Sequence, residues 1–111
     1  MMNCENSLIQ MHKKPYLNLI GLAYRARKCS LGEETIIRDI QEGRAKLVLL
    51  ANDTGKQTKK KLTDKCHFYN VPLYVVDDDR DTLSKAVGKT DRVAIAILDD
   101  GFAKKFKTLL N

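Results

Sequence analysis

The chain has 111 residues with a hydrophobic fraction of 43%, which suits one ordered domain and argues against disorder. It contains no apolar run near the roughly 18 residues of a membrane span, and its first ten residues lack the basic-then-apolar order of a secretory signal. Its net charge is +6. We therefore expect a cytoplasmic protein with no membrane partner.

Positive charge is concentrated in the first half of the chain. Residues 1–12 carry one acidic side chain, residues 13–61 carry 12 basic and 5 acidic side chains, and residues 62–111 carry 8 of each. A basic half joined to a neutral half favours a one-sided electrostatic field that faces a polyanion such as RNA.

Two helices are predicted in the first half, after a flexible tail over residues 1–13. Pro15 suits the first turn of the first helix. Residues 30–33 have the S-x-x-E pattern of a capping box and predict the start of the second helix, which Gly43 ends.

Strands and helices alternate in the second half. Residues 47–51, 73–76 and 93–98 are short apolar runs typical of strands buried on both faces. Residues 54–57 have the T-x-x-Q pattern of a capping box and open a helix that ends near Asn70.

Three residues of that helix are expected to form its buried stripe: Leu62, Cys66 and Tyr69. Two further helices follow, with aspartates as candidate caps: Asp79 or Asp81 for the first, and Asp99 or Asp100 for the second. This alternation predicts an α/β fold with a parallel-rich sheet and helices on both faces.

No motif for catalysis, a cofactor or a metal fits the sequence. Gly55 and Lys56 lie between a strand and a helix, but Leu50 stands where a phosphate-binding loop needs glycine. The aspartates within residues 77–81 could bind a metal, although helix capping and a solvated loop are commoner roles for such a cluster. The three cysteines are far apart and include no CxxC pair. We expect no enzyme, no cofactor and no metal site.

Basic residues precede the predicted start of the second helix. Arg25, Arg27 and Lys28 come shortly before Gly32, at a helix end whose free N–H groups attract phosphate. Glycine there allows a ligand backbone to approach closely. A second basic run over residues 56–61 is either a further RNA contact or an exposed helix face.

Five segments have a familiar order: Gly21–Lys28 with Gly32–Glu34, Ala45–Asp53, Val71–Tyr74, Ala86–Lys89 with Arg92–Val93, and Asp99–Ala103. Together, over about residues 14–111, they resemble the kink-turn RNA-binding ribosomal protein family of the L7Ae and L30e type. The last segment is similar to that of the small bacterial YlxQ-like members.

The resemblance implies a three-layer α/β/α sandwich with a central, about four-stranded mixed sheet. It implies one RNA-binding domain over residues 14–111 without catalytic residues, which binds kinked RNA through the second helix N-terminus and a late loop. The family's helix begins Gly-x-Asn-Glu-x-x-Lys, and here Gly32 precedes Glu34, Thr35 and Arg38 at the polar positions. Arg38 preserves the charge, whereas an ionised Glu34 only accepts hydrogen bonds.

The residues expected to bind RNA are Lys28, Gly32, Glu33, Glu34, Thr35, Arg38, Lys89 and Arg92, with Arg25, Arg27 and Lys56 as further contacts to the RNA backbone. The expected function is recognition of structured RNA by a ribosome-associated monomer. Two alternatives stay open from the sequence: a basic protein-interaction module that meets an acidic partner, and a small RNA-acting enzyme.

Overall fold

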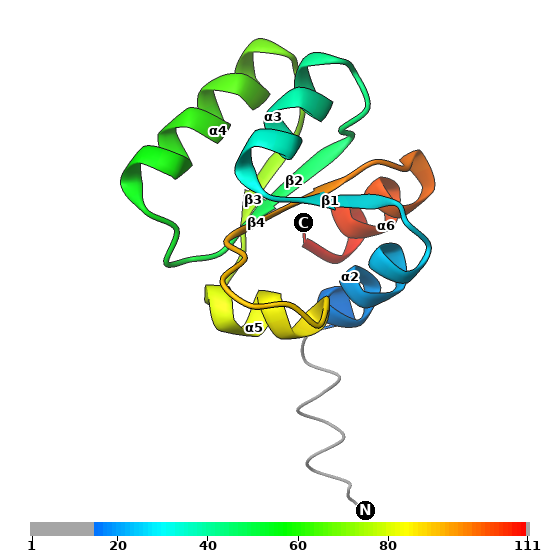
Figure 1. Cartoon of the computed structure of the whole chain (residues 1–111). Coiled ribbons are helices and arrows are strands. Elements are labelled where there is room, and N and C mark those ends of the chain that lie inside the picture. The colour runs from blue at the N-terminus through cyan, green and yellow to red at the C-terminus, as the bar shows by residue number, and fades with distance from the viewer. Residues whose placement is uncertain (1–14, 111) are drawn as a thin grey trace, which may run out of the picture.

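The computed structural model describes residues 15–110, which form four strands and five helices (Figure 1). The strands are β1 (Cys29–Leu31), β2 (Leu47–Leu50), β3 (Leu73–Val75) and β4 (Ala94–Ile97). The helices are α2 (Pro15–Arg25), α3 (Glu33–Gln41), α4 (Lys56–Phe68), α5 (Arg80–Ala86) and α6 (Asp100–Leu110). The tail predicted over residues 1–13 lies outside the described residues.

The four strands form one mixed sheet with the order β1-β4-β2-β3. β2 pairs with β3 in parallel, whereas β4 is antiparallel to both β1 and β2. The mixed sheet is confirmed, but the parallel-rich sheet expected from the alternation is wrong. Leu50 pairs with both Val75 and Ala94, so β4 starts where β2 and β3 end. The chain thus returns to the same end of the sheet through α5 and its following loop.

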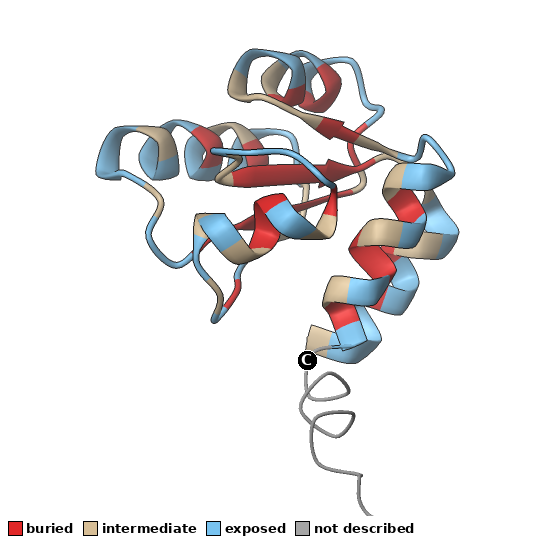
Figure 2. Cartoon of the chain, turned by 60° about the horizontal axis from the view of Figure 1, so that its bottom comes forward, coloured by how far each residue is buried: buried red, intermediate tan, exposed pale blue. Residues whose placement is uncertain are grey.

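Helices cover both faces of the sheet, which confirms the three-layer sandwich (Figures 1 and 2). Successive residues of a strand face opposite sides, and all residues of β2 and β4 are buried. One core cluster joins the sheet to α3 and α4 through Ile36, Ile40, Leu62 and Cys66. The other joins it to α2, α5 and α6 through Ile20, Leu83 and Phe106.

Both predicted capping boxes are wrong. Ser30 lies in β1, where it pairs with Ala96 of β4, and Gly32 occupies the N-cap position of α3. Pairing with a central strand outweighs the local capping pattern here. The Thr54 hydroxyl donates to the Ala51 carbonyl at 2.6 Å, which leaves Gly55 as the N-cap of α4.

Other helix ends agree with the sequence. Asp79 caps α5 by accepting from the Thr82 N–H at 3.0 Å, and Asp99 accepts from the Phe102 N–H at 2.9 Å at the start of α6. The predicted stripe of α4 is right for Leu62 and Cys66 but wrong for Tyr69, which is exposed beyond the end of the helix. Within residues 15–110, no helix is long and apolar enough to cross a bilayer.

Candidate nucleic-acid interface

The start of α3 presents a polar edge opposite its buried side. Ile36 and Ile40 are fully or almost fully buried, whereas Glu34, Thr35 and Arg38 are exposed. Residues three and four apart lie on one face of a helix. The three residues therefore share one exposed face of α3, as the sequence predicted.

Gly32 brings the backbone into the geometry that starts this helix. Its φ of 92° lies in a region that favours glycine, and its carbonyl accepts the Ile36 N–H at 3.0 Å. A glycine N-cap supplies no side-chain acceptor for the first-turn N–H groups. These groups and the positive end of the helix dipole are suited to an anionic ligand.

The late loop before β4 lies against this helix start, as the resemblance implied. The Arg92 Nη1 atom is 3.8 Å from the position that a Cβ would take at Gly32. Ser84 anchors the loop, because its hydroxyl accepts the Arg92 N–H at 2.7 Å and its carbonyl accepts the Lys89 N–H at 2.9 Å. The Arg92 Nε atom is buried and has no hydrogen-bond partner within residues 15–110.

The Glu33 side chain faces α4 in this structure. Its carboxylate accepts from the Thr58 hydroxyl at 2.9 Å and pairs with the Lys61 ammonium at 2.8 Å. The hydrogen bonds from Lys61 and then Thr58 hold the pKa of Glu33 below its usual value. The Glu33 carboxylate thus joins the start of α3 to the first half of α4. Lys56, the first residue of α4, is exposed.

The other predicted basic contacts form a second group, around the end of α2. Arg25, Arg27 and Lys28 are exposed there, and the Lys28 carbonyl accepts the Leu98 N–H at 2.7 Å. Four residue steps along β1 separate Lys28 from Gly32, about 13 Å of extended chain. The Lys89 ammonium lies 5.9 Å from the centroid of the Tyr24 ring in α2. Lys89 thus contacts the end of α2, whereas Arg92 adjoins α3.

Arg80 is a functional candidate that the sequence analysis missed. Its guanidinium contacts the Asp53 carboxylate and the Asp91 carboxylate at 3.3 Å each, and donates to the Asp53 carbonyl at 2.9 Å. One side chain therefore joins the loop after β2, the start of α5 and the late loop. Asp53 is 27 residues from Arg80, and no local pattern relates them.

The contacts of the aspartates within residues 77–81, and the burial of Cys29 and Cys66, are typical of structural roles. Asp79 caps α5, and Asp81 pairs with Lys85 at 3.2 Å. Within residues 15–110 no three His, Cys, Asp or Glu side chains group as metal ligands. Burial raises the pKa of the Cys29 and Cys66 thiols to about 11, so both are protonated at neutral pH.

The chain belongs to the ribosomal protein L7Ae/L30e/S12e/Gadd45 family, whose family model matches residues 16–107. It is 48% identical over 93 residues to the RNA-binding protein YlxQ of Bacillus subtilis, covering 84% of this chain and 92% of the relative. This confirms the resemblance found in the sequence.

Solved structures similar to the chain include the following two. A protein of unknown function from Bacillus halodurans has a TM-score of 0.82 and 45% identity, covering 86% of this chain and 95% of that one. The Giardia lamblia 15.5kD RNA binding protein has a TM-score of 0.69 and 19% identity, with coverage of 85% and 86%. The second likeness concerns the fold alone.

Proposed function

We propose that this protein binds structured RNA with a kink or irregular base pairs, as a monomer associated with the ribosome. The observation that carries the proposal is the position of Arg92 beside Gly32, next to the exposed polar edge of Glu34, Thr35 and Arg38. The name of the Bacillus subtilis relative, an RNA-binding protein, supports the same class of ligand.

Each group of this surface has a matching group in RNA. Arg38 and Arg92 can bind phosphates or guanine edges with paired N–H donors. Glu34 can accept from a guanine amino group, and Thr35 can donate or accept. A regular A-form duplex hides its major-groove base edges, so this edge of α3 needs a kink, loop or bulge to reach them.

The test compares two RNAs and two variants of the full chain. Arg38→Ala should weaken binding to a kinked RNA with tandem sheared G·A pairs by roughly 5- to 150-fold, the range of one specific contact. It should affect a plain duplex much less. The control is Lys60→Ala, which removes a cation already paired with Asp64 at 3.0 Å. It should weaken both RNAs slightly and equally. If Arg38→Ala preserves the preference for kinked RNA, α3 does not read the RNA.

A further inference from the structure

The end of α4 carries an aromatic pair beside a basic groove. We propose that this surface is a second RNA site, which binds a single-stranded segment by stacking a base on the Phe68–Tyr69 pair. It is separate from the kinked-RNA surface and does not depend on it. We call it the α4-end site, formed by Phe68, Tyr69, Asn70, Lys46, Lys104 and Lys107.

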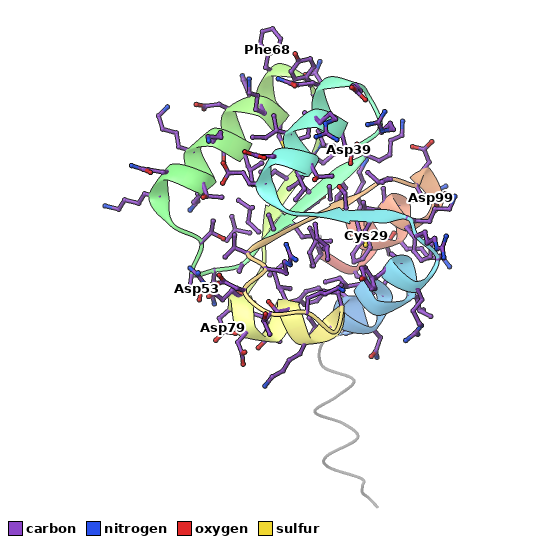
Figure 3. The ribbon with its side chains drawn as sticks, in the orientation of Figure 1. Cys29, Asp39, Asp53, Phe68, Asp79 and Asp99 are labelled. Carbon is purple, nitrogen blue, oxygen red and sulfur yellow. The ribbon has the colours of Figure 1, made fainter. Side chains whose placement is uncertain are left out.

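Phe68 is the most exposed large hydrophobic side chain within residues 15–110, and it packs against the partly exposed Tyr69. Phe68 is 76% exposed and Tyr69 39% exposed, and their ring centroids are 4.9 Å apart at an interplanar angle of 73°. Figure 3 shows Phe68 projecting from the end of α4 away from the body of the protein. In an edge-to-face pair, each ring holds the other in place. The outer face of the more exposed ring, Phe68, stays open, as a stacking base requires.

A groove lies directly beside Tyr69. The segments that meet there are the end of α3 with the turn after it, the loop between α4 and β3, and residues 100–107 of α6. Its lining includes Tyr69, Asn70 and three lysines, Lys46, Lys104 and Lys107, against one carboxylate, Asp100. The balance of these charges is positive and suits a phosphate backbone that continues from a stacked base.

Some cations within residues 15–110 are held by carboxylates: Arg44, Lys60, Lys61, Arg80 and Lys85. Within residues 15–110 neither Lys104 nor Lys107 has an ion-pair partner at 4.0 Å or less, and the Lys46 ammonium donates to the Gly43 carbonyl at 3.2 Å. A cation without a carboxylate partner is free to bind an RNA phosphate, and that binding releases counterions from the RNA.

Single-stranded RNA fits this surface better than other occupants. Duplex bases are already stacked on each other, so an exposed ring recognises unpaired bases. A second copy related by a twofold axis would place the same three lysines against each other, which opposes association. The site is also separated from the start of α3, because Glu33 contacts Thr58 of α4, and Phe68 ends that helix ten residues and about 15 Å further along.

The test titrates the ¹⁵N-labelled full chain with a ten-nucleotide oligouridylate. Amide shifts should appear around Gly43, in residues 68–72 and in residues 100–107 of α6. Phe68→Ala should weaken binding about tenfold, the scale of one stacked base. The control Leu22→Ala removes another exposed apolar side chain, 49% exposed, from α2 and should leave affinity unchanged.

Two lysines of α6, one inside the α4-end site and one outside it, test the contribution of positive charge. Lys107→Ala should weaken binding a few-fold and reduce the log–log salt slope by about one. Lys105→Ala should change neither, because Lys105 lines a different groove, between α2 and α6. Arg38→Ala should leave oligouridylate affinity within about twofold, which separates this site from the kinked-RNA surface.

Three results would overturn the proposal. The first is amide shifts confined to residues 28–38 and 87–93, and the second is equal affinity of Phe68→Ala and Leu22→Ala. The third is binding of polyglutamate at the same amides without any effect of Phe68→Ala, which would assign the groove to an acidic protein. Any of them leaves the kinked-RNA proposal intact if Arg38→Ala still abolishes the preference for kinked RNA.

Discussion

Gly32 is set apart by its backbone conformation and not by a close neighbour. Its φ of 92° and ψ of 132° disfavour any side chain, while the space for a Cβ is sufficient because the nearest atom, Arg92 Nη1, is 3.8 Å away. The backbone angle, and not steric crowding, is therefore what requires glycine at the start of α3.

Replacing Gly32 by Ala should destabilise the protein by about 1–3 kcal/mol through backbone strain. Gly55→Ala is the matched control, because Gly55 is also an N-cap but has an ordinary φ of −60° and no atom within 4 Å of its Cβ position. Urea unfolding of both variants measures the difference. Equal losses of stability would show that the φ at Gly32 imposes no strain.

Arg80 acts at the scale of elements, because it fixes the late loop relative to the loop after β2. Its exposed fraction is 40%, so its pairs with Asp53 and Asp91 are partly screened by solvent. Their effect on global stability should be modest, about 1 kcal/mol. Their main effect should be to hold Arg92 in position, because Arg92 follows Asp91 in the chain.

Arg80→Ala should speed amide hydrogen exchange in residues 51–54 and 89–93 and weaken kinked-RNA binding without removing an RNA contact. Lys85→Ala is the control from the same helix, since it breaks only the Lys85–Asp81 pair within α5. Hydrogen exchange measured residue by residue tests this, because local opening is read directly from protection. Unchanged exchange in both loops would contradict the role of Arg80.

The sequence predicted most elements of the fold, because long apolar runs and aspartate caps act locally. β2, β4 and the caps Asp79 and Asp99 are examples. β1 was missed because three residues cannot show alternation and its Ser30 fits a capping box. The antiparallel direction of β4 was missed, because the direction of a strand depends on the end of the sheet at which the chain re-enters it. No local sequence pattern encodes that.

The candidate site was predicted in part. Periodicity placed Glu34, Thr35 and Arg38 on one exposed edge, and the structure agrees. The contact of Arg92 with the start of α3 followed from the resemblance alone. The pairing of Glu33 with α4 and the contacts of Arg80 were not predictable, because they join side chains 25 and 27 residues apart. That these residues bind RNA stays a prediction, which the Arg38→Ala and Lys60→Ala variants test.

At the scale of the whole molecule, internal pairing decides which charges are available to a polyanion. The chain has 20 basic and 14 acidic residues, and carboxylates pair with Arg44, Lys60, Lys61, Arg80 and Lys85. The proposed kinked-RNA surface instead uses cations for which no ion pair is found among residues 15–110: Lys28, Arg38, Lys89 and Arg92. Four such cations set the expected salt dependence of binding.

If all four engage phosphates, the slope of log affinity against log salt should be about −2.8 to −3.6, since each contact contributes about −0.7 to −0.9. Affinity for kinked RNA should then fall roughly 50- to 150-fold between about 50 and 200 mM salt. Arg38→Ala should reduce the slope by about one, whereas Lys60→Ala should hardly change it because Lys60 already pairs with Asp64. Fluorescence anisotropy over a salt series measures both slopes. A slope near zero for the unmodified chain would mean that phosphate contacts do not drive binding, and the basic surface would then need a partner other than nucleic acid.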